Sequence, residues 1–112
     1  MSREREYRDY VQDMLEAADK VASFISGMTQ DQFLADEKTQ YAVVRALEVI
    51  GEAAKKVPLA FRQEHPQVPW REVVGMRDKL IHDYFGVNVV VVWKTATEDA
   101  PNIASALREI LL

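Results

Sequence analysis

The chain has 112 residues, a length typical of one domain with a modest hydrophobic core. Hydrophobic residues make up 48% of the chain and charged residues 29%, a balance that excludes a disordered polypeptide. The net charge of −4 argues against a broad electrostatic nucleic-acid binder but leaves room for a small basic cleft.

Cysteine content and hydropathy further limit the classes of protein to which the chain could belong. The chain has no cysteine, so disulfides and thiolate metal sites are excluded, which suits a reducing cytoplasm. No apolar signal region follows the first residues, and the longest purely apolar run, residues 89–93, is far too short to span a membrane. We therefore expect residues 1–112 to form a single cytoplasmic domain with no membrane partner.

The first half of the chain predicts two long helices. The first should cover residues 2–26, where apolar side chains recur every three or four residues, and Gly27 would end it. Thr29 then suits a helix N-cap, with Gln32 as its capping-box partner, at the start of a short turn. The second long helix should cover residues 38–57, and Pro58 would end it or open the next turn. Its apolar stripe would comprise Tyr41, Val44, Leu47, Ile50, Ala54 and Val57.

The second half predicts a loop and further helices. Residues 62–69 hold two prolines and read as a loop, and a third long helix should cover residues 70–85 and stop at Gly86. Asn88 can cap a fourth helical stretch, although its four valines also suit a strand. An isolated strand would lack a partner, so we expect helix there, with Pro101 beginning or kinking a last piece that ends near Leu112. Four main helices with short connections predict an all-α bundle.

The third long helix carries an unexpected charge. Its apolar positions include Val73, Leu80 and Tyr84, and helical spacing predicts another apolar residue where the sequence has Arg77. A charge within a buried stripe is costly unless it is paired or needed, and the alternative is a side chain that extends to the surface. Gly75 costs this helix about 1 kcal/mol relative to alanine, so either something packs close to it or it arose by neutral drift.

The same helix places further polar groups at regular spacing. Asp78 and His82 are spaced i,i+4, so the carboxylate could orient the imidazole and raise its pKa. Arg77 and His82 diverge by roughly 140° around the helix axis. They would converge on one phosphate more easily if two such helices met across a two-fold axis. The spacing therefore favours a homodimer whose interface includes residues 70–85.

Other charged groups have simpler interpretations. His65 is mainly a loop residue, and Glu48 and Glu52 are better explained as solvated carboxylates, with Lys56 at i+4 from Glu52, than as a paired acid site. The two histidines are 17 residues apart and match no metal-ligand spacing, and no P-loop is present, so we expect no metal and no cofactor. A basic rim could come from Lys55, Lys56, Arg62, Arg71 and Lys79, although ordinary surface charge explains any one of them better.

Residues 77–84 read Arg-x4-His-x-Tyr, which resembles the signature of HepT-like toxins in the HEPN ribonuclease superfamily. Residues 70–76, 85–87 and 42–55, and Trp93, resemble the family as well, so the likeness covers nearly the whole chain. The resemblance implies a homodimeric HEPN-type bundle of four to five helices and a metal-independent endoribonuclease. It also implies that Arg77 and His82 are the catalytic pair, supported by Asp78.

The resemblance implies a protein partner as well. In a type VII-like toxin–antitoxin pair, an MntA-like nucleotidyltransferase antitoxin would transfer AMP to Tyr84 and silence the toxin. Two other functions stay open: a non-catalytic dimer that binds nucleotide or RNA and regulates a nucleotidyltransferase, and a motif helix that serves only as a dimer seam. The acidic net charge favours the binding dimer slightly, and the intact Arg–His pair favours the ribonuclease. The substrate would be RNA, because the chemistry needs a 2′-hydroxyl.

Overall fold

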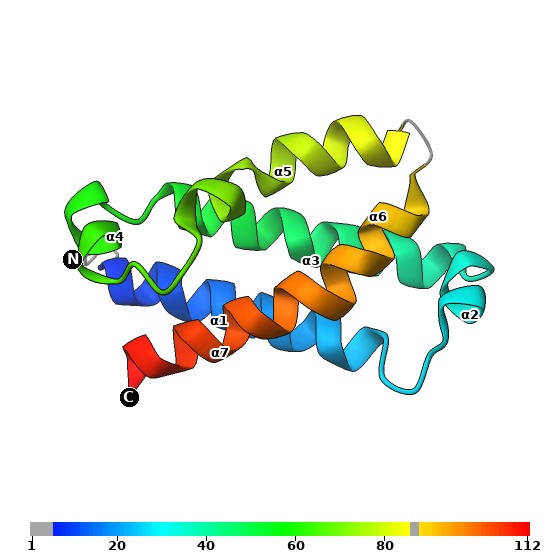
Figure 1. The fold of residues 1–112 in the computed structure, drawn as a ribbon, viewed down its shortest axis with the longest axis horizontal. Helices are drawn as coiled ribbons and strands as arrows, with labels where there is room; N and C mark the ends of the chain where they lie inside the picture. The colour runs from blue at the N-terminus through cyan, green and yellow to red at the C-terminus, as the bar shows by residue number, and fades with distance from the viewer. Residues whose placement is uncertain (1–5, 86–87) are drawn as a thin grey trace, which may run out of the picture.

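The computed structural model describes the backbone of residues 6–85 and 88–112, and the side chains of residues 6–80 and 88–112. Within these ranges all regular structure is helical, which confirms the predicted all-α class (Figure 1). The elements are α1 (Tyr7–Phe24), α2 (Gln30–Leu34), α3 (Glu37–Lys55), α4 (Leu59–Glu64), α5 (Trp70–Phe85), α6 (Val89–Lys94), the π-helix η1 (Thr95–Asp99) and α7 (Ala100–Leu111). The last three follow one another without a break and form one long rod.

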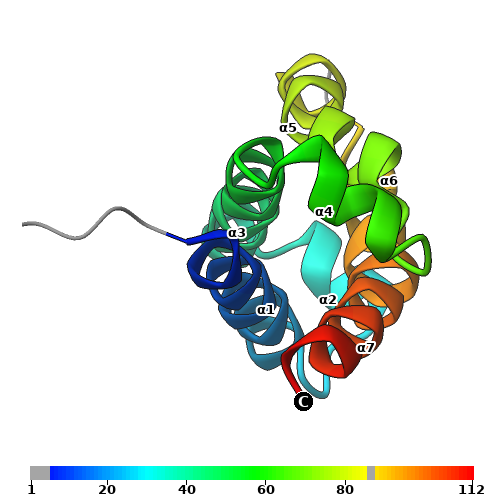
Figure 2. The ribbon, with the colours of Figure 1, turned by 90° about the vertical axis from the view of Figure 1, so that its left-hand side faces the viewer.

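The long helices form an open bundle. α3 packs between α1 and α5, and α7 packs against α1 (Figures 1 and 2). α5 contacts the rod at α6 and diverges from it toward α7, while α4 and α2 lie at opposite ends of the bundle (Figure 1). The core is built from one apolar face of each long helix and includes Val11, Met14, Val21, Leu47, Ile50, Val73, Leu80 and Leu107. None of the described helices is long and apolar enough to cross a bilayer.

Local signals in the sequence fix several helix ends. Gly27 has a φ of 76°, so it turns the chain after α1 as glycine can. The capping box predicted at Thr29 is confirmed: its hydroxyl accepts from the Gln32 backbone N–H at 3.2 Å, and Gln32 Oε1 accepts from the Thr29 backbone N–H at 2.9 Å. Asn88 caps α6, as predicted, by accepting from the Val91 backbone N–H. The four valines are therefore helical.

Asp36 is a cap that the sequence analysis did not identify. Its carboxylate accepts hydrogen bonds from the Thr39 hydroxyl at 2.6 Å and from the Thr39 backbone N–H at 3.1 Å. These two hydrogen bonds, the side-chain one first, lower the pKa of Asp36 below its ordinary value of 3.8. The charged carboxylate therefore stabilises the first turn of α3.

The loop predicted at residues 62–69 is partly wrong, because residues 62–64 belong to α4. Pro58 is the N-cap of that helix. Phe61 is buried, and the centroid of its ring lies 4.3 Å from the centroid of the Tyr7 ring. Arg62 donates to the backbone carbonyls of Val57 at 2.9 Å and Ala54 at 3.1 Å. These bonds satisfy carbonyls near the end of α3, so α4 folds back as a cap on the preceding helix.

The stripe predicted for the second helix is wrong at Tyr41, whose exposed fraction is 57%. Gln40 takes the inward position instead and is buried. Its side-chain amide donates to the carbonyls of Phe33 at 2.9 Å and Leu34 at 3.1 Å. A polar residue faces inward here because it bonds to the end of α2, where carbonyls lack helical partners.

Candidate functional site

The site forms where α3 and α5 approach each other closely. A Cβ atom added at Gly51 of α3 would lie 3.2 Å from the backbone nitrogen of Arg77 and 3.2 Å from the carbonyl oxygen of Val73. A Cβ atom at this distance would be unusually close to the α5 backbone, so any side chain here would push the two helices apart by a few tenths of an ångström. Gly51 therefore sets the separation of the two helices at Arg77. By contrast, a Cβ atom at Gly75 would meet nothing within 4 Å, so no close contact among the described residues explains that glycine.

Arg77 does not lie within the buried stripe; its side chain extends to the surface, which is the alternative that the sequence left open. Met76 occupies the inward position between Val73 and Leu80, at the i, i+3, i+7 spacing of one helix face. The Arg77 side chain lies beside this stripe, next to α3, and is 49% exposed. Its charge therefore stays in contact with solvent, and the cost of burying it does not arise.

Glu52 is the partner of Arg77, and sequence reasoning assigned it differently. Its Oε1 atom lies 3.4 Å from Arg77 Nε and 3.3 Å from Nη1 of Arg45. Lys56, the partner expected from i,i+4 spacing, instead places its ammonium over the ring of Tyr10, 5.7 Å from the centroid. The Glu52–Arg77 contact joins two helices, so spacing within one helix could not reveal it. A signal was present in the adjacent Gly51, which permits the close approach.

A cavity of about 220 Å³ lies between α3 and α5 at this point. Two lysines of α3, Lys55 and Lys56, line it together with Arg77, and these three cations outnumber the two carboxylates of Glu52 and Asp78. The cavity is thus locally basic although the whole chain is acidic, a combination that suits a phosphate group. Asp78 lines the same cavity as Arg77, and its supporting role toward His82 stays a prediction.

The other candidate residues either lie away from this cavity or have side chains outside the described residues. His82 and Tyr84 belong to the last turns of α5, but their side chains lie outside the described residues, and their roles stay predictions. The His65 ring packs against Phe61 at 4.4 Å between centroids, and its carbonyl accepts from the indole of Trp70 at 2.9 Å, so this histidine joins α4 to α5. Among the described side chains, no group of three or more histidines and carboxylates is placed to hold a metal ion.

Comparison with known proteins identifies relatives along nearly the whole chain. The family model described as "Ribonuclease HepT-like" matches residues 14–110. "Probable ribonuclease HepT" of Thermococcus cleftensis is 48% identical over 95% of this chain and 96% of its own length. Proteins named "Putative RNase" are 43% identical in Methanocaldococcus jannaschii, over 96% of this chain and 88% of the relative, and 41% identical in Caldanaerobacter subterraneus, over 93% of each. No solved structure gives a significant match.

Proposed function

The chain belongs to the HepT-like ribonuclease family, and from that premise we propose that it is a metal-independent endoribonuclease in which Arg77 and His82 carry the chemistry. The observation that supports this most is the position of Arg77, half-exposed at a locally basic cavity and held there by Glu52. The neighbouring Lys55 and Lys56 would raise the local concentration of RNA phosphate.

The proposed reaction is an internal transfer at phosphorus. His82 accepts the proton of an RNA 2′-hydroxyl, and the 2′-oxygen attacks the adjacent phosphorus. The bond from phosphorus to the 5′-oxygen breaks, and that oxygen takes up a proton from the protonated His82 or from water, so the products are a 2′,3′-cyclic phosphate and a 5′-hydroxyl. Arg77 stabilises the negative charge that develops on the phosphoryl oxygens through its planar array of N–H donors. The substrate supplies the nucleophile, so this route requires no metal-bound water.

RNA cleavage in the presence of a chelator tests the assignment. We expect Arg77→Ala and His82→Ala each to lower the cleavage rate about a hundredfold or more, since each removes one oriented catalytic group. Arg8→Ala is the matched control, because Arg8 is an exposed arginine on α1 outside the cavity. Cleavage at the wild-type rate by purified His82→Ala would refute the assignment.

One alternative keeps the same residues without catalysis. The chain is acidic overall, with a net charge of −4. This favours slightly a dimer that binds nucleotide or RNA phosphate and regulates a nucleotidyltransferase. Wild-type protein that binds RNA, loses binding in Arg77→Ala and never cleaves would support this alternative over the ribonuclease.

The proposal includes an antitoxin that modifies Tyr84. AMP attached to this tyrosine would place a phosphate two helical turns from Arg77, where it would compete for the arginine's donors and block RNA. Intact mass spectrometry after co-expression with a cognate nucleotidyltransferase is the test. The wild type should gain the mass of one AMP group and Tyr84→Phe should not, and equal gain by both would exclude Tyr84 as the acceptor.

A further inference from the structure

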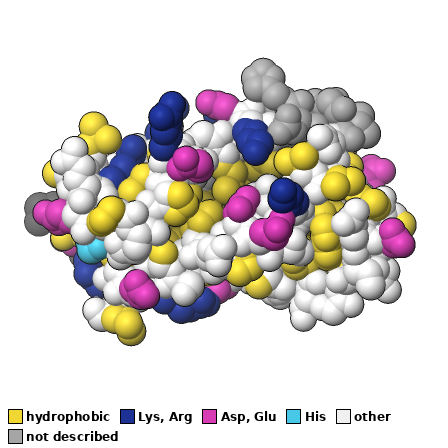
Figure 3. Space-filling model, in the orientation of Figure 1, with side chains coloured by type: hydrophobic (Ala, Val, Ile, Leu, Met, Phe, Trp, Pro, Cys, Tyr) yellow, Lys and Arg dark blue, Asp and Glu magenta, His cyan; other side chains and the backbone are white. Residues whose placement is uncertain are grey.

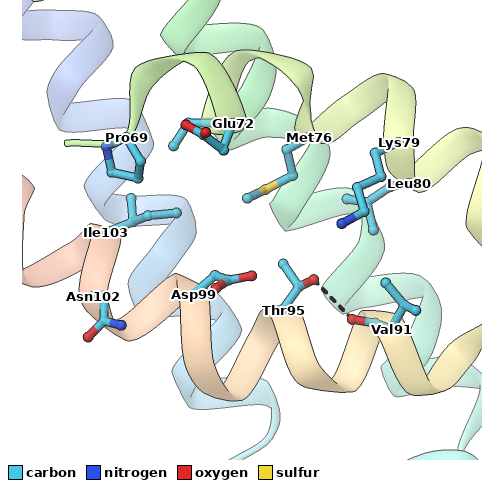
Figure 4. A pocket seen from close by; sticks show the side chains of 11 residues that line it. Pro69, Glu72, Met76, Lys79, Leu80, Val91, Thr95, Asp99, Asn102 and Ile103 are labelled. Atoms are coloured by element: carbon cyan, nitrogen blue, oxygen red, sulfur yellow. Dashed lines mark hydrogen bonds between the residues drawn. The ribbon is translucent and has the colours of Figure 1, made fainter.

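A second, larger cavity lies on the other side of α5 from Arg77. It has a volume of about 370 Å³ and opens where α5 diverges from the α6–η1–α7 rod (Figures 1 and 4). This volume falls within the range of about 300–1,000 Å³ typical of small-molecule sites. Neither Arg77 nor Glu52 lines it, so it is separate from the candidate nuclease site.

The floor of this cavity is apolar. Met76 and Leu80 of α5 and Ile103 of α7 contribute to it, and the Met76 thioether projects into the space between the two walls (Figure 4). Figure 3 shows hydrophobic side chains along the band between α5 and the rod, with acidic and basic side chains on both sides. Such a floor favours a ligand with an apolar body, which loses contact with water when it binds.

Two carboxylates enter the cavity from opposite walls. Glu72 comes from α5 and Asp99 from η1, and both are exposed residues that line the cavity (Figure 4). In the part of the chain that the structure describes, neither carboxylate has a hydrogen-bond or ion-pair partner. Two carboxylates on opposite walls of one cavity make its lining acidic at this end, which favours a cationic ligand.

The π-helix shapes the wall that carries Asp99. A π-helical turn is rare and occurs frequently at functional sites, and η1 directs both Thr95 and Asp99 to the cavity. The Thr95 hydroxyl donates to the carbonyl of Val91 at 2.9 Å, so its oxygen can still accept a hydrogen bond from a ligand. Lys79 lines the cavity seven residues along α5 from Glu72, which places a positive charge toward the opposite end.

We propose that this cavity binds a small organic cation with an apolar body. The ammonium lies between Glu72 and Asp99, and the apolar body covers Met76. The end of the ligand that lies near Lys79 is neutral or anionic, because a second cation there would be repelled.

Calorimetric titration of the full chain with tryptamine and with its neutral counterpart tryptophol tests the proposal. For a ligand of this size we expect a dissociation constant on the order of 1 mM for tryptamine. Tryptophol should bind about tenfold more weakly, because it lacks the charge that strengthens a hydrogen bond to a carboxylate. Amide chemical shifts should change at Met76 and Thr95.

Isosteric variants locate the charge recognition. Glu72→Gln and Asp99→Asn should each bring tryptamine to the affinity of tryptophol, while Glu98→Gln should leave it unchanged, since Glu98 is an exposed carboxylate of η1 outside the cavity. Equal binding of the two compounds, an equal loss in Glu98→Gln, shift changes confined to α3, or no binding because a second copy covers the cavity would each overturn the proposal. None of these measurements depends on RNA cleavage, so the result is independent of the proposed nuclease function.

Discussion

At the scale of single residues, Arg77 is both paired and available. Its contact with Glu52 uses Nε, the inner nitrogen of the guanidinium. Among the described residues, the two terminal nitrogens of Arg77 have no partner, so they can donate to two oxygens of one phosphate. Glu52 also binds Arg45, which fixes the carboxylate on the surface of α3. We therefore regard Glu52 as a positioning residue for Arg77.

This arrangement predicts the behaviour of Glu52→Gln. The amide keeps the shape of the side chain but removes the charge that orients the guanidinium, so kcat for RNA cleavage should fall about tenfold, equivalent to about 1.4 kcal/mol, with less change in KM. Glu48→Gln is the matched control, because Glu48 binds Arg45 at 3.4 Å and has no contact with Arg77. Equal losses in both variants would show that only the charge of α3 matters.

At the scale of helices, Gly51 of α3 sets the distance to α5. In Gly51→Ala the new methyl group would lie 3.2 Å from two backbone atoms, which cannot rotate away as a side chain can. We expect urea denaturation to show a loss of about 1–3 kcal/mol in the free energy of unfolding. RNA cleavage should fall too, because Arg77 would move with α5.

Gly75→Ala is the control for this prediction, and we expect it to change the free energy of unfolding in the opposite direction. Nothing lies within 4 Å of a Cβ atom at this position in the chain, so alanine only improves helix propensity. At protein concentrations where the chain is monomeric, the free energy of unfolding should rise by about 0.5–1 kcal/mol. A stability loss of the same size in both variants would mean that the α3–α5 contact is not the cause.

The cap of α3 predicts a pH effect of defined sign. The folded state lowers the pKa of Asp36, so the folded chain binds this proton less readily than the unfolded chain. The stabilisation is therefore present above pH 3.8 and is lost as the pH falls through the lowered pKa. Asp36→Asn should have a lower Tm than the wild type at pH 7, and the difference should shrink at pH 3. A constant difference across this range would assign the effect to shape alone.

The sequence predicted the ends of individual helices well, but it did not predict how the helices contact one another. The bounds of α5 and the caps at Thr29 and Asn88 were predictable, because periodicity and capping act within a few residues. The place of Arg77 beside Glu52 was not, since it depends on how two helices meet. The π-helix η1 was missed as well. A helical pattern that continues through residues 89–111 gives no sign of one turn with a different hydrogen-bond register.

At the scale of the whole molecule, the outward face of α5 is exposed and could pack against a second copy of the chain. Arg71, Gly75 and Asp78 are exposed on this face, and Asp78 also lines the edge of the Arg77 cavity. Gly75 costs the helix about 1 kcal/mol relative to alanine, and no contact with the described part of the chain offsets that cost. Close packing of a second α5 across a two-fold axis would offset this cost. We therefore propose that this face is the homodimer interface.

The dimer is tested by filling the gap at Gly75. Gly75→Arg adds a long side chain in open space, so the monomer should keep its fold, while the dissociation constant of the dimer should rise at least about a hundredfold because two such side chains clash across the axis. Sedimentation equilibrium at micromolar concentration measures this, and circular dichroism checks the helix content. A wild-type chain that is monomeric under these conditions would refute the dimer.

Mixing two inactive variants tests whether the dimer builds the site. If Arg77 of one copy works with His82 of the other, a dimer of one Arg77→Ala chain and one His82→Ala chain has both defects in one site and an intact second site. Random pairing makes half of the dimers mixed, so an equal mixture should recover about a quarter of wild-type RNA cleavage. If Arg77 and His82 of the same copy work together, every site in the mixture lacks one group and no activity returns. Adding Gly75→Arg to both variants should abolish any recovered activity, because the recovery requires that the two chains associate through α5.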